Sequence, residues 1–269
     1  MHRRAADRQG RARTLFLSDI HLGWKRSRVR ELAEFLRRVD AECIVLVGDI
    51  VDALSMGKRF FWSEEHSQVL RILLARRRAG ARLVYLPGNH DAGLSIFAEL
   101  LHGAVEVHRE WVHQTAAGTR LLVCHGDQFE GVLACPGWLY KLGDALYEMN
   151  LAVNHGINDL RRTLGKPYRS LGERLKLALP TSARYIARFE QSAVDYASAQ
   201  GYEGIVCGHI HRPNLRRIAG TVYANTGDWV ESCSALVEDH RGELQLYRWP
   251  GDGKQHTLRE EPVLLADAA

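Results

Sequence analysis

Short apolar runs recur along the chain, and five of them end in small clusters of Asp, His and Asn. A run of this kind is typical of a strand that is buried on both faces of a sheet. The five clusters are SDIHLG (18–23), GDIVD (48–52), GNHD (88–91), CHGD (124–127) and GHIH (208–211). Because functional groups in open α/β sheets gather beyond the carboxyl ends of the strands, we expect these clusters to meet at one edge.

Helical stretches separate the strand-like runs in the first half of the chain. Residues 26–40 and 63–80 carry apolar side chains at helical spacing. Residues 106–115 and 119–127 look like a pair of strands joined by a turn, and further strand-like runs follow between 204 and 249. Strands interleaved with helices predict an α/β fold in which helices cover the faces of a sheet.

The pattern changes between about 129 and 200, where only helical stretches are found. This change predicts a helical insertion within a single domain that spans 14–249. Residues 1–13 hold five arginines and no apolar run, so we expect a basic flexible tail rather than a secretory signal. Residues 250–269 are expected to form a C-terminal tail.

The composition narrows the class of protein. With 46% hydrophobic and 25% charged residues, the 269-residue chain has the composition of a soluble globular protein. No segment reaches the roughly eighteen uninterrupted apolar residues of a membrane span. Five scattered cysteines without CxxC spacing indicate a reducing cytoplasm. The net charge of +4 includes no long basic stripe, so no nucleic-acid partner is expected.

The side chains of the five clusters form a mixed set of nitrogen and oxygen ligands. Carboxylate, amide and imidazole groups without thiolates suit manganese, iron or zinc. In GHIH, alternate residues share one face of an extended segment, so both imidazoles are expected to point the same way. Asp49 would bridge two cations, which compensates a charge that is otherwise costly to bury. Asp52 is expected to support one of the metal ligands.

In this order the clusters are similar to the motifs of the calcineurin-like metallophosphoesterase superfamily, over about residues 14–249. The resemblance implies a two-sheet β-sandwich flanked by helices, with a helical cap insertion and two metal ions at one edge. The implied ligands of one metal are Asp19, His21, Asp49 and His211. Those of the other metal are Asp49, Asn89, His125 and His209. The resemblance also implies that His90 protonates the leaving group or steadies the transition state, and that Asp91 orients His90.

Within the superfamily, the chain resembles the branch that contains the UDP-2,3-diacylglucosamine pyrophosphohydrolases. LFLSDIHLG, CHGD, GHIHRP, the helical insertion and GDWVES (227–232) carry this resemblance. It implies cleavage of a nucleotide-linked glycolipid to UMP and 2,3-diacylglucosamine 1-phosphate, a reaction of lipid A synthesis. The implied mechanism is attack by water at two metal ions. Manganese is the expected metal, and iron and zinc are the alternatives. It also implies a cytoplasmic protein in peripheral contact with the cytoplasmic face of the inner membrane.

The insertion is the segment from which a substrate preference would come. Residues 137–200 hold more Lys and Arg than Asp and Glu, together with many aromatic residues. Such a segment could bind an anionic head group, accept acyl chains or touch a membrane surface. Its apolar positions, at helical spacing, could equally pack against the domain below. Lys166 and Arg169 are the candidates for phosphate contacts.

Two other functions remain open from the sequence. The lipid branch has arginine after the metal-binding asparagine, whereas this chain has His90, the residue that is commoner in general phosphodiesterases and phosphatases. A soluble substrate, such as a cyclic nucleotide or a phosphoprotein, is therefore the alternative. A non-catalytic scaffold is disfavoured, because scaffolds of this superfamily lose motif residues that are all present here.

Overall fold

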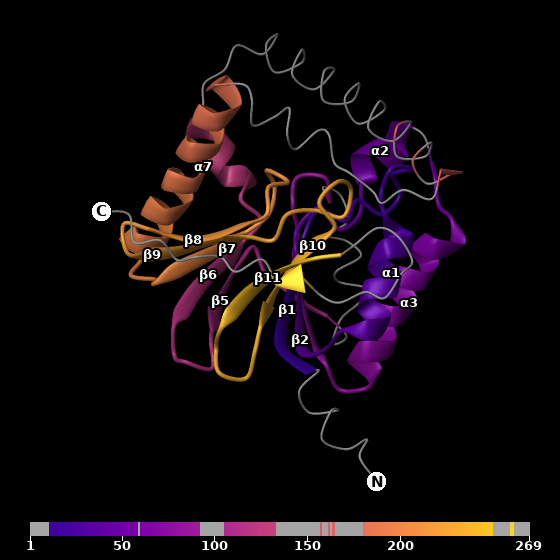
Figure 1. The fold of residues 1–269 in the computed structure, drawn as a ribbon, viewed down its shortest axis with the longest axis horizontal. Helices are drawn as coiled ribbons and strands as arrows, with labels where there is room; N and C mark the ends of the chain where they lie inside the picture. Colours follow the sequence, from indigo (N-terminus) through magenta and orange to yellow (C-terminus); the bar gives the residue numbers. More distant parts are fainter. Residues whose placement is uncertain are drawn as a thin grey trace.

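The computed structural model describes residues 11–58, 60–91, 105–132, 157, 161, 163–164, 180–249 and 259–260. Two sheets lie face to face in the middle of the molecule (Figure 1). The strands of the seven-stranded sheet, in spatial order, are β12 (Arg259–Glu260), β11 (Leu244–Arg248), β10 (Ser234–Glu238), β1 (Arg11–Leu17), β2 (Asp40–Val47), β3 (Arg82–Leu86) and β4 (Glu106–Val107). Those of the five-stranded sheet are β5 (Glu110–Gln114), β6 (Arg120–Cys124), β7 (Gly204–Cys207), β9 (Thr221–Asn225) and β8 (Asn214–Ile218).

Helices cover the outer face of each sheet. The helices of the described residues are α1 (Val29–Arg38), α2 (Ala53–Lys58), α3 (Glu64–Arg78), α7 (Pro180–Ala199) and the 3-10 helix η2 (Asp127–Val132). Figure 1 shows α1 and α3 beside the first sheet and α7 against the second. Leu32, Phe35 and Leu36 of α1 recur at helical spacing and are buried in an apolar cluster that also contains Leu15 of β1. Burial of such a face stabilises a helix of this length more than its intrinsic propensity does.

A second apolar cluster fills the space between the two sheets. It joins Phe16 of β1 and Val45 of β2 to Val123 of β6 and Val206 of β7. The molecule therefore has four layers in the order helix, sheet, sheet and helix. This arrangement confirms the predicted two-sheet sandwich flanked by helices.

The central strands run parallel, which fixes where the functional edge lies. β1 pairs with β2 and β2 pairs with β3 in parallel, while β6, β7 and β9 are parallel in the other sheet. Parallel strands place their carboxyl ends at the same edge of a sheet, and the crossover segments return over the faces. The predicted hairpin is also present, since β5 and β6 are antiparallel.

Several predicted boundaries were wrong. β1 begins at Arg11, inside the predicted tail, because Arg11 and Ala12 pair with Asp40 and Ala41 at the start of β2. β12 lies inside the predicted C-terminal tail and pairs with β11. The predicted strand 106–115 is two strands, β4 in the first sheet and β5 in the second. Neither α2 nor β8 was predicted from the sequence.

Most of the predicted insertion, including Lys166 and Arg169, lies outside the described residues, so its extent stays a prediction. Its last helix, α7, packs Phe189, Ala193 and Val194 against the second sheet and forms one of the four layers. In the part of the chain that the structure describes, no helix is long and apolar enough to cross a membrane.

Candidate metal centre

Loops after five strands bring Asp and His side chains together at one edge. Asp19 and His21 follow β1, Asp49 follows β2, His90 follows β3, His125 follows β6, and His209 and His211 follow β7. Backbone hydrogen bonds tie the first two loops together, because the N–H of His21 donates to the carbonyl oxygen of Asp49 at 2.9 Å. Three groups of side chains then place their ligand atoms within 4.8 Å of one another. They are Asp19, His21 and His211; His21, Asp49 and His90; and Asp49, His125 and His209.

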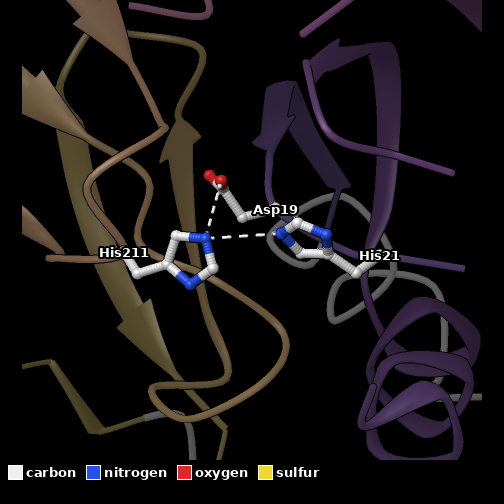
Figure 2. A group of neighbouring side chains, drawn as sticks. All are labelled: Asp19, His21 and His211. Carbon is white, nitrogen blue, oxygen red and sulfur yellow. Dashed lines mark hydrogen bonds and ion pairs between the residues drawn. The ribbon is translucent and has the colours of Figure 1, made fainter. Parts of the chain in front are cut away.

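The first group joins the two sheets. Figure 2 shows the imidazole of His211, from the loop after β7, facing Asp19 and His21 from the loop after β1. Nε2 of His211 lies 3.1 Å from Oδ1 of Asp19 and 3.3 Å from Nε2 of His21. Three donor atoms that converge in this way from two sheets form a cradle of the size that a metal ion needs.

Asp49 lies between the first and the third group. Its Oδ2 atom is 4.0 Å from Nε2 of His21 and 3.3 Å from Nε2 of His125. The Asp49 side chain is 2% exposed, so its charge requires compensation inside the protein. A carboxylate in this position can bridge two cations.

The hydrogen bonds of His125 test whether a metal fits. Its Nδ1 atom lies 2.9 Å from the carbonyl oxygen of Val47 and must donate to it. In the neutral ring, Nε2 then carries a lone pair that faces the carboxylate of Asp49, and two acceptors repel each other unless a cation lies between them. Burial opposes the charged ring, yet the contact with Asp49 raises the pKa of His125 to about 10. The contact between His125 and Asp49 is therefore favourable only with a positive charge between the two side chains, which a divalent ion would supply.

Asp52 supports two imidazoles at once. Its Oδ2 atom is 3.3 Å from Nδ1 of His21, and its Oδ1 atom is 3.1 Å from Nδ1 of His90. Burial would raise the pKa of Asp52, but the hydrogen bonds to His21 and His90 hold it well below its usual range. Nδ1 of His21 therefore faces the carboxylate of Asp52, and its Nε2 atom is directed into the first group.

The predicted role of Asp91 was wrong. Its carboxylate does not orient His90 but accepts hydrogen bonds from the backbone N–H groups of Val51 at 2.8 Å and Gly88 at 2.9 Å. Burial raises the pKa of Asp91, and the carboxyl group holds the turn after β3 against the loop after β2. Asp52 orients His90 instead.

The turn after β3 carries the remaining predicted residues. Asn89 is exposed in this turn, between Gly88 and His90. The backbone N–H of His90 donates to Oδ1 of Asp49 at 2.8 Å, which holds the turn against the bridging carboxylate. The side chain of His90 is 33% exposed at the rim of the group that it forms with His21 and Asp49.

Five of the implied metal ligands adopt left-handed backbone conformations. They are Asp19 (φ 49°), His21 (φ 51°), Asp49 (φ 53°), His209 (φ 69°) and His211 (φ 54°). Residues other than glycine seldom adopt this conformation, and those that do cluster at functional sites. The prediction that GHIH is extended was therefore wrong. β7 ends at Cys207, and the loop sends one histidine to each of two groups.

Sequence reasoning missed the residues that hold Asp19 in place. The hydroxyl of Ser18 donates to the carboxylate of Asp19 and lies 2.5 Å from Oγ1 of Thr226, which follows β9 in the other sheet. Asn225 donates to the carbonyl oxygen of Gly208 at 2.6 Å. The only signal in the sequence is the polar segment NTGD (225–228) after a strand-like run, a pattern that also fits an ordinary turn.

The chain belongs to the calcineurin-like phosphoesterase family, whose model matches residues 12–213. The family and the Asp and His groups at the sheet edge define a metal-dependent phosphoesterase. The chain is 22% identical over 271 residues to a UDP-2,3-diacylglucosamine hydrolase from Neisseria meningitidis serogroup B, an alignment that covers 88% of this chain and 94% of that relative. A UDP-2,3-diacylglucosamine hydrolase from serogroup C of the same species has the same identity and coverage.

Solved structures of similar proteins include Vacuolar Protein Sorting 29 from Cryptosporidium parvum. It is 12% identical, with a TM-score of 0.46, and the match covers 92% of this chain and 96% of that one. Yfce, a phosphoesterase from E. coli, is 18% identical, with a TM-score of 0.43, and the match covers 84% of this chain and 87% of that one.

Proposed function

We propose that this metallophosphoesterase hydrolyses the pyrophosphate of UDP-2,3-diacylglucosamine to UMP and 2,3-diacylglucosamine 1-phosphate. The observation that carries the hydrolytic reaction is the position of Asp49, whose buried carboxylate lies within 4.0 Å of imidazoles from two separate groups. The substrate is supported by the similarity to the Neisseria hydrolases, which extends over 88% of this chain.

We propose that the centre holds two divalent ions, that manganese is the preferred metal, and that iron and zinc are the alternatives. The proposed ligands are Asp19, His21, Asp49 and His211 for one ion and Asp49, Asn89, His125 and His209 for the other. Two such ions lower the pKa of a bound water and neutralise charge on the phosphoryl oxygens. The remaining steps are proton transfer and positioning, and these fall to side chains of this chain.

His90 is the proposed proton donor. Burial would lower the pKa of His90, but its hydrogen bond to Asp52 and the charge of Asp49 outweigh burial and raise it. A raised pKa favours the protonated ring, which is the form that a general acid requires. The partial exposure of the ring leaves it accessible to a leaving-group oxygen.

The proposed substrate places the protein at a membrane surface. A diacylated substrate resides in the bilayer, so we propose peripheral contact with the cytoplasmic face of the inner membrane. Lys166 and Arg169 are the proposed phosphate contacts, on the basis of their charge and their position in the insertion.

His90 also favours a second candidate, a soluble phosphodiester or phosphomonoester. Pyrophosphate cleavage releases a phosphate, whose second pKa is about 6, so that it departs without a proton donor. An alkoxide, whose parent alcohol is nearly as weak an acid as water (pKa about 15.7), leaves far faster when a general acid protonates it. The pairing of His90 with Asp52 is therefore more useful for an ester of an alcohol.

The deciding experiment is incubation of metal-stripped protein with UDP-2,3-diacylglucosamine, with and without manganese, and measurement of UMP. Manganese-dependent release of UMP that is lost in Asp49→Ala supports the proposed substrate. If no UMP forms while a generic aryl phosphodiester is hydrolysed in a manganese-dependent way, the lipid substrate is rejected and the second candidate takes its place.

A further inference from the structure

We propose that Phe189 and Glu190, two neighbouring residues of α7, are positioning residues for the metal centre. Phe189 contacts His209 near the start of the loop 208–213, which carries His209 and His211, and Glu190 contacts Asn214, the residue that follows this loop. This inference rests on the proposed metal centre and adds to it an element from outside the five motifs.

Phe189 fixes the ring of His209. The two rings are stacked, with centroids 6.1 Å apart and an angle of 26° between their planes. Phe189 is 0% exposed, and its ring makes an edge-to-face contact with Phe129 at a centroid distance of 5.8 Å. Because an imidazole can coordinate a metal only when its nitrogen points along the bond, a fixed ring plane predisposes His209 for binding.

Glu190 fixes the far end of the same loop. Its side chain is buried, and Oε1 accepts a hydrogen bond from Nδ2 of Asn214 at 2.8 Å. Its Oε2 atom pairs with the guanidinium of Arg216 on β8. A buried carboxylate that loses such partners is strongly destabilised, so the contact resists displacement of the loop relative to α7.

The two contacts position ligands of both proposed metal ions. The loop between them contributes His211 to the group with Asp19 and His21, and His209 to the group with Asp49 and His125. Adjacent helix residues point in different directions. The side chain of Phe189 therefore contacts the metal ligand His209, while that of Glu190 contacts β8. A loop held at both ends loses less conformational freedom on metal binding, which favours high affinity.

The test compares Phe189→Leu and Glu190→Gln with Val194→Ala. Val194 is buried on the same helix and in the same apolar cluster as Phe189. Each variant is titrated with manganese in competition with a chelating dye, and the thermal midpoint of the metal-free protein is recorded. We expect Phe189→Leu and Glu190→Gln to weaken manganese binding by about tenfold or more. Val194→Ala should lower the thermal midpoint and leave manganese affinity within about twofold.

Phe189→Tyr keeps an aromatic face on His209 and should retain the wild-type affinity. Wild-type affinity in both Phe189→Leu and Glu190→Gln, or an equal loss in Val194→Ala, would overturn the inference. The titration needs no substrate. Wild-type protein that binds manganese but releases no UMP rejects the proposed substrate, while the variants still decide the role of α7.

Discussion

Nδ1 of His90 lies 3.1 Å from Oδ1 of Asp52, and the other oxygen of the same carboxylate lies 3.3 Å from Nδ1 of His21. One buried carboxylate thus fixes the proposed proton donor and a proposed metal ligand. It sets the orientation of both rings, and its charge stabilises the protonated form of His90. The proton donor and the metal centre are therefore coupled through Asp52.

The first prediction concerns the pH dependence of activity. Asp52→Asn removes the charge that helps to raise the pKa of His90, so this pKa falls. Because the protonated ring is the active form, activity is lost as pH rises through its pKa. We expect the alkaline limb of kcat to move to lower pH by about one unit in the variant. The profile is measured at saturating manganese, and an alkaline limb that does not move contradicts the role of Asp52.

The second prediction concerns the leaving group. His90→Gln should lower kcat by about a hundredfold or more for phosphodiesters of simple alcohols. For substrates that release a phosphate, kcat should fall much less, because this leaving group needs no proton. A series of esters with leaving groups of graded acidity measures the effect. An equal loss across the series would show that His90 acts on the transition-state charge and not on the leaving group.

The third prediction concerns Gly208, which precedes His209. A Cβ atom at this position would lie 2.5 Å from Oδ2 of Asp19 and would also collide with the hydroxyl of Ser18. Gly208→Ala should therefore displace a metal ligand and weaken manganese binding by about tenfold or more. The matched control is Gly57→Ala, whose Cβ would have nothing within 4 Å. Equal manganese affinity in the two variants would contradict the tight approach of the two loops.

The fourth prediction concerns a buried, hydrogen-bonded carboxylate away from the site. Oε2 of Glu238 on β10 lies 2.7 Å from Nε2 of His113 on β5 and links the two sheets. Burial would raise the pKa of Glu238, but the hydrogen bond from His113 lowers it. This contribution to stability is present above the unfolded pKa of about 4.3 and is lost as pH falls through the lower folded pKa.

Glu238→Gln should lower the free energy of unfolding at pH 7 by about 3 kcal/mol, because it removes a buried charge that Arg13 and His113 contact. As pH is lowered below ~4.3, the free energy of unfolding should decrease less in this variant than in the wild type. Urea unfolding at several pH values measures both effects, and parallel pH curves for the two proteins would contradict the assignment.

The pattern of apolar runs and polar clusters predicted an α/β fold and the types of metal ligand, and the family resemblance implied the two-sheet sandwich. Each polar cluster follows an apolar run, and parallel strands bring their carboxyl ends together at one edge whatever the conformation of the loops. The meeting of the strand ends does not depend on the exact loop conformation, which is why Asp19, His125 and His211 could be chosen from the sequence. The partner of His90, which could have been Asp52 or Asp91, could not be chosen in the same way, because it depends on the left-handed turns of the loops.

Contacts between the two sheets were not predictable in the same way. Ser18 meets Thr226 and His113 meets Glu238 across more than one hundred residues, with no spacing rule to connect them. The stacking of Phe189 on His209 is of the same kind, since an aromatic residue at helical spacing predicts burial but not its partner.

The most direct test of the central claim is the metal content of the reconstituted protein. Wild type and Asp49→Asn would be stripped, reloaded with manganese, desalted and measured by mass spectrometry. A bridging Asp49 predicts about two manganese ions per wild-type chain and a loss of both in the variant, since each would lose a ligand. One ion or none in the wild type, or two retained in the variant, would contradict a dinuclear centre built on Asp49.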